Sequence, residues 1–125
     1  MTRPAESTRS RGAAGEERAA SWLAASGWVV RERNFRAPSG EIDIIAEKGG
    51  EVAFVEVKAW SAMPEAELEH AIDRRKQQRI VRTARYYLSR QPRCAGMRLR
   101  FDVVFIDAAT SRLRHIENAF NGGID

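Results

Sequence analysis

The pattern of apolar and polar positions divides the chain into helical and extended stretches. Apolar residues at a spacing of about 3.6 predict helices at 12–26 and 65–90. Short apolar runs between turn residues predict strands at 27–35, 41–47, 51–59, 98–107 and within 111–120. The order α-β-β-β-α-β-β is typical of an α/β fold with a mixed central sheet flanked by helices.

The length of the chain, 125 residues, suits one domain. We assign it to 12–121, with an N-terminal tail at 1–11 that is expected to be disordered and a C-terminal tail at 122–125. No stretch approaches the ~18 apolar residues of a membrane span, and the N-terminus lacks the apolar core of a signal peptide. With Cys94 as the single cysteine, the sequence predicts a cytoplasmic protein that does not bind membranes.

Charged residues interrupt the two strands that should be the most apolar part of the sheet. Residues 40–60, GEIDIIAEKGGEVAFVEVKAW, contain four of them: Glu41, Asp43, Glu56 and Lys58. If the Gly-Gly pair forms a two-residue hairpin loop, the numbers of cross-strand partners sum to about 99. Asp43 then lies opposite Glu56, and in the same way Glu41 lies opposite Lys58. A loop of three or five residues would shift this pairing by one.

Two carboxylates that face each other across a hairpin repel, and they need either a raised pKa or a bound cation. A hard divalent ion such as Mg²⁺ accepts one or two carboxylates and leaves positions for water and phosphate. Lys58, on the same strand face as Glu56, is placed to stabilise developing negative charge or to orient a metal-bound water. The competing interpretation is a solvent-exposed charged face that keeps a sheet edge soluble. Because Ile45 and Phe54 share that face, the pattern favours a site for metal-assisted phosphodiester hydrolysis.

Each predicted helix carries a charged residue on its apolar side. Glu16 lies on the inner stripe of the first helix, and Lys76 lies on that of the second. Buried charge is costly unless it is paired, so both side chains are expected to point toward the charged cluster on the sheet. A partly exposed helix flank would explain either residue alone, but their coincidence with the hairpin charges favours a site.

The positive charge of the chain comes almost entirely from arginine. The net charge is +4 and the isoelectric point is about 9.8. The planar fork of arginine suits phosphate oxygens, which favours a nucleic-acid partner. In the second helix, i, i+4, i+7 spacing places Arg75, Arg79 and Arg82 on one face, which we expect to bind a phosphate backbone with little base readout. A solvated helix face is the alternative.

Five sequence blocks occur in a fixed order over residues 12–120: GEERAASWLAASGWVVRERNF, GEIDII, VAFVEVK, the helical Lys76 and RFDVVFI. GEID followed by EVK, after a helix that contains a Glu, resembles the PD-(D/E)XK nuclease fold. The full set resembles the YraN-like family of small bacterial proteins, which is described as endonuclease-like and related to archaeal Holliday-junction resolvases. The resemblance implies a restriction-endonuclease-like αβββαβ core that presents the Asp and the ExK to a Mg²⁺ site.

The resemblance also implies roles for individual residues. Asp43 and Glu56 would be ligands of Mg²⁺ or Mn²⁺, and Lys58 would be the catalytic lysine. Glu16 would contact the metal through water, while Lys76 would support the scissile phosphate. Glu41 belongs to the GEID block, where it is placed to pair with Lys58.

The chain departs from the family pattern directly after EVK. Family members usually carry a basic residue there, whereas this chain has Ala59 and Trp60. Trp60 is expected to stack on a base instead. His70 and His115 lack metal-ligand spacing and are interpreted as surface or partly packed residues, and Cys94 has no chemical partner at ligand spacing.

Three functions remain open from the sequence. The first is a Mg²⁺-dependent endonuclease acting on DNA, with branched DNA among its candidate substrates; a junction-cutting enzyme would need two sites and therefore a homodimer. The second is a non-catalytic nucleic-acid-binding module that retains the nuclease fold. The third is an interaction protein in which the charged cluster is a buried salt-bridge network.

Overall fold

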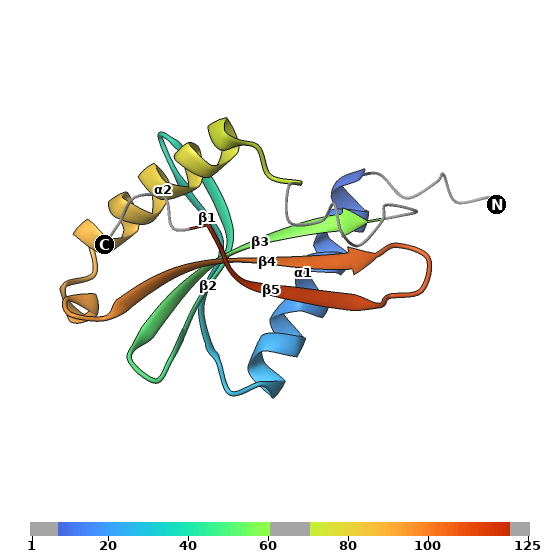
Figure 1. Cartoon of the computed structure of the whole chain (residues 1–125), viewed down its shortest axis with the longest axis horizontal. Coiled ribbons are helices and arrows are strands. Elements are labelled where there is room, and N and C mark those ends of the chain that lie inside the picture. The colour runs from blue at the N-terminus through green and yellow to red at the C-terminus, as the bar shows by residue number, and fades with distance from the viewer. Residues whose placement is uncertain (1–7, 61–70, 121–125) are drawn as a thin grey trace.

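The computed structural model describes residues 8–60 and 71–120 of the chain, and its elements follow the expected order (Figure 1). They are α1 (Thr8–Ala25), β1 (Val29–Ala37), β2 (Gly40–Lys48), β3 (Glu51–Trp60), α2 (Arg74–Ser89), a 3₁₀ turn η2 (Pro92–Cys94), β4 (Arg98–Asp107) and β5 (Leu113–Phe120). No described helix is long and apolar enough to cross a membrane. Residues 1–7 of the expected N-terminal tail and the whole expected C-terminal tail at 122–125 lie outside the described residues, but 8–11 already belong to α1.

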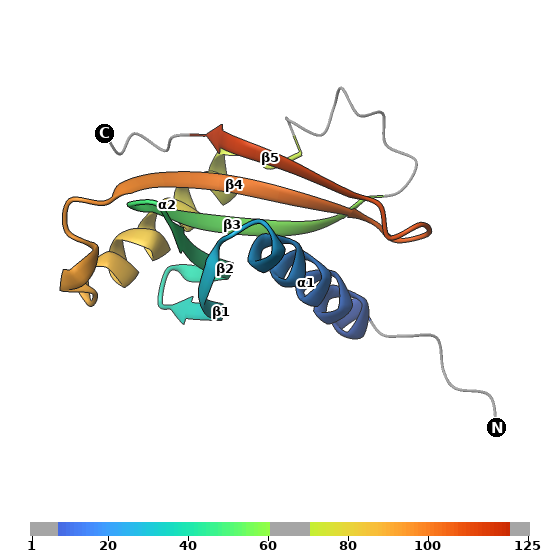
Figure 2. The same cartoon turned by 90° about the horizontal axis from the view of Figure 1, so that it is seen from below.

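The five strands form one mixed sheet in the order β1-β2-β3-β4-β5. Strand β3 runs parallel to β4, and the other neighbouring strands are antiparallel. The parallel pair follows from the chain order, because α2 carries the chain back across the sheet before β4 begins. Seen from a second direction, α1 covers one face of the sheet and α2 the other (Figure 2). The α/β class and the mixed central sheet are thus confirmed.

The second helix is shorter than its sequence pattern indicates. It begins at Arg74, because the side chain of Asp73 accepts a hydrogen bond from the backbone N–H of Lys76 at 2.8 Å and so caps the helix. Residues 71–73 are described and are not helical, which contradicts a continuous helix from 65. The part of that prediction at 65–70, like His70, lies outside the described residues.

The β2–β3 hairpin has the register that a two-residue Gly-Gly loop requires. Its cross-strand pairs run from Lys48 with Glu51 to Ile44 with Val55. Gly49 has φ 56° and its successor has φ 79°, as a primed turn demands and as side chains with a Cβ rarely adopt. The predicted register is therefore confirmed for the loop end of the hairpin.

Apolar side chains fill both faces of the sheet. On the α1 face the buried cluster includes Ala19, Leu23, Ile44, Val55 and Val104. On the α2 face it includes Ile45, Phe54, Ile80, Tyr87 and Phe101. Strict alternation of side chains along a strand would place Ile42 with Ile44, but Ile42 packs in the α2 cluster, so alternation along β2 fails near its start.

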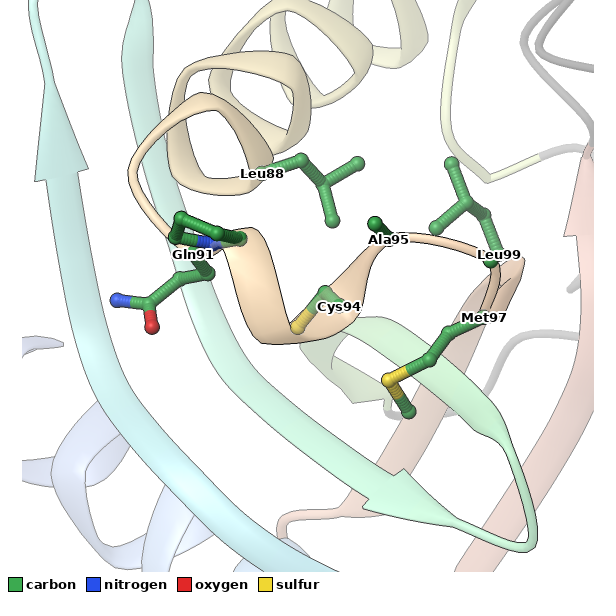
Figure 3. A pocket seen from close by; sticks show the side chains of 8 residues that line it. Leu88, Gln91, Cys94, Ala95, Met97 and Leu99 are labelled. Carbon is green, nitrogen blue, oxygen red and sulfur yellow. The ribbon is translucent and has the colours of Figure 1, made fainter.

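A small apolar hollow lies at the far end of α2, where the chain turns through η2 into β4 (Figure 3). It is lined by Leu88, Gln91, Pro92, Cys94, Ala95, Gly96, Met97 and Leu99. Cys94 is buried, and burial raises the pKa of its thiol above the usual range, so this cysteine is held as an unreactive thiol. The hollow lacks cationic side chains and lies at the opposite end of α2 from Lys76.

Candidate functional site

The candidate site lies where β2 and β3 stop pairing. The last paired residues are Ile44 and Val55. Beyond them, the backbone N–H of Val57 donates a hydrogen bond of 2.8 Å to Oδ2 of Asp43. The side-chain carboxylate of Asp43 thus accepts a hydrogen bond from the backbone of β3. This contact holds Asp43 close to Glu56 at the point where the two strands separate.

The environment of Asp43 opposes its ionisation. Burial is the main cause that raises the pKa of Asp43, and the charge of Glu56 is the next. Glu16 and Glu41 add to the effect, whereas the Val57 N–H partly offsets it. The pKa of Asp43 is raised from 3.8 to about 7. Asp43 is therefore a carboxyl group that gains strongly from a nearby cation.

Glu56 is the second buried carboxylate of the site. Its side chain is 9% exposed, and Nζ of Lys76 lies 3.4 Å from its Oε1. Burial raises the pKa of Glu56 above the usual value, although the charges of Lys76 and, more weakly, Lys58 act in the opposite direction. The two lysines thus lie near enough to influence the charge state of Glu56.

Both helices place a charged residue at the candidate site, as the sequence pattern indicates. A Cβ at Gly15 would lie 3.9 Å from Cγ1 of Val57, so α1 packs closely on β3 beside the site. The half-buried Glu16 follows directly, and its charge acts on Asp43. From the other face, α2 brings Lys76 to Glu56. Asp43, Glu56, Glu16 and Lys76 therefore gather from four elements.

Glu41 behaves differently from the expectation that it pairs with Lys58. Its Oε2 lies 3.4 Å from Nε of Arg36, its neighbour on β1. Because β2 and β3 have separated by this point, β1 supplies the ion-pair partner. Glu41 still contributes negative charge to the site, since it raises the pKa of Asp43.

The donor set of the site fits a hard divalent ion with few protein ligands. Among residues 8–60 and 71–120, no group of three or more Asp, Glu, His or Cys side chains could hold a metal ion. Mg²⁺ commonly uses one or two carboxylates and fills its other positions with water and phosphate. The oxygen pair of Asp43 and Glu56 is buried, and Asp43 has no ion-pair partner among the described residues, which matches that requirement.

The residues predicted to contact nucleic acid differ in their exposure to solvent. Arg75, Arg79 and Arg82 are exposed on α2. Trp60 is only 7% exposed and packs in a third buried cluster with Ile72, Val103 and Phe105. This corrects the expectation that Trp60 stacks on a base, because its ring is already covered by the core.

A charged network between β4 and β5 was not anticipated from the sequence. Asp102 is fully buried and accepts hydrogen bonds from Arg100 at 2.8 Å and from Nε2 of His115 at 2.7 Å. Burial alone would raise the pKa of Asp102, but the hydrogen bonds from His115 and Arg100 outweigh it and lower that pKa. The only sequence signal was the i, i+2 spacing of Arg100 and Asp102 on one strand face.

Comparison with known proteins identifies relatives along most of the chain. The model of the uncharacterised protein family UPF0102 matches residues 15–106. A UPF0102 protein of Rhodopseudomonas palustris (strain BisA53) is 46% identical over 110 residues, which cover 88% of this chain and 82% of that protein. One of Persephonella marina is 39% identical over 111 residues, covering 89% and 93%. One of Moorella thermoacetica is 45% identical over 98 residues, covering 78% and 81%. None of these descriptions assigns an activity.

Proposed function

The chain belongs to the uncharacterised protein family UPF0102, which is the YraN-like family that its sequence resembles, and we propose that it is a divalent-metal-dependent nuclease acting on DNA. The observation that carries the proposal is the pairing of two buried carboxylates, Asp43 and Glu56, at the opening of the hairpin. Burial, and after it the charge of Glu56, raises the pKa of Asp43 to about 7. Glu56 pairs with Lys76, but Asp43 has no ion-pair partner among the described residues, so the charge of Asp43 is left without a compensating cation.

The side chains of the site support hydrolysis of a phosphodiester. Asp43 and Glu56 would hold Mg²⁺ or Mn²⁺, with Glu16 able to accept a hydrogen bond from a water in the same site. When bound, such an ion polarises the phosphoryl oxygen and lowers the pKa of its water. Lys58 places an ammonium group beside Glu56, where it stabilises negative charge that develops on the phosphate. Lys76, released from Glu56, would orient a non-bridging phosphate oxygen.

The arrangement of the elements agrees with a PD-(D/E)XK core. In the αβββαβ order, the Asp lies on β2, the ExK on β3 and the supporting residues on the two helices that cover opposite faces. A fold by itself does not fix a function. The proposal therefore depends on the carboxylate pair and its two lysines rather than on the topology.

The first test is calorimetric titration of Mg²⁺ and Mn²⁺ into the wild-type protein and into Asp43→Ala. We expect saturable binding in the wild type and its loss in the variant, because one of the two carboxylates is gone. Glu32→Ala, which removes an exposed carboxylate on β1, is the matched control and should bind like the wild type. If binding is absent without DNA, the titration is repeated with DNA present, since phosphate completes many magnesium sites.

Cleavage of DNA with Mg²⁺ or Mn²⁺ is the second test. Substitution of Asp43, Glu56 or Lys58 by Ala should lower the rate by at least about 100-fold, as expected when a charge-stabilising group is lost. Binding of DNA without cleavage, unaffected by Asp43→Ala, would instead support the non-catalytic binding module. A melting temperature that does not respond to Mg²⁺ with or without DNA would favour a salt-bridge network.

A further inference from the structure

The arginines of α2 lack carboxylate partners among the described residues, whereas several arginines elsewhere in the chain have one. Five arginines outside α2 form ion pairs with Glu or Asp: Arg31, Arg33, Arg36, Arg93 and Arg100. Within α2, Arg74–Ser89, no arginine has an ion pair with any described residue, and the helix contains no acidic residue. Lys76 alone is paired, with Glu56. The remaining positive charge is therefore available to an external anion.

Three of these cations, together with Arg90 directly after the helix, lie along one flank of α2. Arg75, Arg79, Arg82 and Arg90 lie at i, i+4, i+7 and i+15, and we call them the α2 arginine row. The row extends over roughly 22 Å at 1.5 Å per residue. That length corresponds to about six base pairs of a double helix at 3.4 Å per base pair.

The α2 arginine row starts beside the site, on a helix that packs against β1 and β2 (Figure 1). Arg75 directly precedes Lys76, whose Nζ contacts Glu56. Further along, a Cβ at Gly40 would lie 3.8 Å from Cβ of Arg79, which places that arginine against the β1–β2 turn. A nucleic acid that follows the row therefore leads from the end of α2 to the carboxylate pair.

The aromatic residues beside the row are already in contact with other side chains. Tyr86 lies within the row, but the guanidinium of Arg90 lies 4.4 Å from its ring centroid and the ring of Phe35 lies 6.2 Å away. Trp60 is buried. The exposed large apolar side chains among the described residues are Trp22 and Val29, which belong to α1 and β1. Proteins that hold single strands generally stack bases on exposed aromatic rings, and among the described residues no exposed aromatic ring lies beside the row.

From the unpaired cations and the missing stacking surface, we propose that the α2 arginine row binds the phosphate backbone of double-stranded DNA. This inference rests on the proposed function, because it identifies the form of nucleic acid that the same site receives. Backbone contacts of this kind position a duplex without reading its sequence. Charge complementarity between the row and one strand of the duplex provides the affinity.

The test compares binding of a 20-base-pair DNA duplex with binding of one of its strands, measured by fluorescence anisotropy in EDTA across a salt series. EDTA removes the metal ion that the proposed cleavage requires, so binding is measured separately from catalysis. The test variant is Arg75→Gln with Arg82→Gln. The control is Arg74→Gln with Arg85→Gln, which removes the same charge from the same helix about 100° away from the row.

We expect the duplex to bind more tightly than the single strand. The test variant should weaken duplex binding by about 10-fold at ~0.1 M salt and lower the slope of log K against log salt by about 1.8, since each lost phosphate contact contributes about 0.9. The control should change affinity by less than about 3-fold. Equal or tighter binding of the single strand would overturn the duplex assignment, and equal losses in both variants would overturn the row. Either failure leaves the metal titration of Asp43 unaffected, so the two proposals fail separately.

Discussion

At the scale of single residues, Asp43 combines two conflicting interactions. The Val57 N–H donates to its carboxylate at 2.8 Å, which favours the charged form. Burial and the charge of Glu56 favour the neutral form and prevail, so that the pKa of Asp43 is about 7. A group in this position destabilises the folded protein whenever it is ionised without a cation. Such a cost is expected of a binding site rather than of a structural ion pair.

The stability of the metal-free protein should therefore depend on pH through Asp43. Because the folded-state pKa is raised, the unfolded chain loses this proton first. The favourable contribution is complete below about pH 4 and is lost as the pH rises to about 7. Asp43→Asn keeps an oxygen for the Val57 N–H but carries no charge. In urea unfolding with EDTA, it should gain ~2 kcal/mol over the wild type between pH 4.5 and pH 8.

Glu32→Gln is the control for this comparison, since Glu32 is an exposed carboxylate on β1. Its stability difference from the wild type should change little over the same pH range. A constant difference between Asp43→Asn and the wild type from pH 4.5 to pH 8 would contradict the assigned environment of Asp43.

At the scale of elements, the site depends on how closely α2 approaches the β1–β2 turn. Ser39 Oγ lies 2.9 Å from Thr83 Oγ1, which links the turn to the helix. Gly40 has φ 152°, and a Cβ there would lie 3.5 Å from Thr83 Oγ1. These contacts fix the start of β2, the strand that carries Asp43, relative to the helix that carries Lys76.

Alanine substitutions at two glycines should have opposite effects on stability. Gly40→Ala should destabilise the protein by about 1–3 kcal/mol, because its backbone conformation is strained for a residue with a Cβ. Gly15→Ala should stabilise it by about 0.5–1 kcal/mol, since Gly15 is inside α1 and its new Cβ would make ordinary contacts with Val57 and Ile106. Thermal unfolding measures both changes. Equal effects of the same sign would contradict the proposed packing.

The sequence predicted elements well where local signals determine them. The fourth strand matches exactly the observed β4, Arg98–Asp107, and the Gly-Gly pair set the hairpin register. The start of α2 was predicted wrongly because the helical spacing of apolar residues already begins at Ile72, whereas the helix itself begins only after its N-cap, Asp73. The partner of Glu41 was missed for a different reason: the opening of β2 from β3 is a property of the sheet, which strand alternation alone does not contain.

The candidate site was predictable in part because its residues are charged where apolar ones are expected. Asp43, Glu56 and Lys76 all violate the local pattern, and the structure brings them together. The burial of Trp60 was not predictable, since its cover comes from Ile72 and from β4, which are distant in sequence. Charge in an apolar run is visible locally, whereas the cover of an aromatic ring depends on the complete packing.

At the scale of the whole molecule, a second buried charged network joins β4 to β5. Arg100 joins Asp102 on β4 to Glu117 on β5, both at 2.8 Å, and its guanidinium lies 4.9 Å from the ring of Trp28. His115 adds a further contact from β5 to Asp102. In contrast to Asp43, Asp102 has its negative charge balanced by Arg100 and accepts a further hydrogen bond from His115. We therefore assign Asp102 a structural role.

The two buried aspartates should therefore respond oppositely to the same substitution. Asp102→Asn removes the charge that Arg100 and His115 neutralise, and it should cost about 3–5 kcal/mol at pH 7, whereas Asp43→Asn stabilises. Because the pKa of Asp102 is lowered in the folded state, the contribution of Asp102 to the free energy of unfolding is present above about pH 4 and is lost as the pH falls through the folded-state pKa. The cost of Asp102→Asn, measured by urea unfolding, should consequently shrink below pH 4.

Mg²⁺ affinity of the folded variant should equal that of the wild type, since the network is separate from Asp43 and Glu56. A loss of Mg²⁺ binding in a folded Asp102→Asn protein would show that the two networks are coupled and would contradict this division of roles.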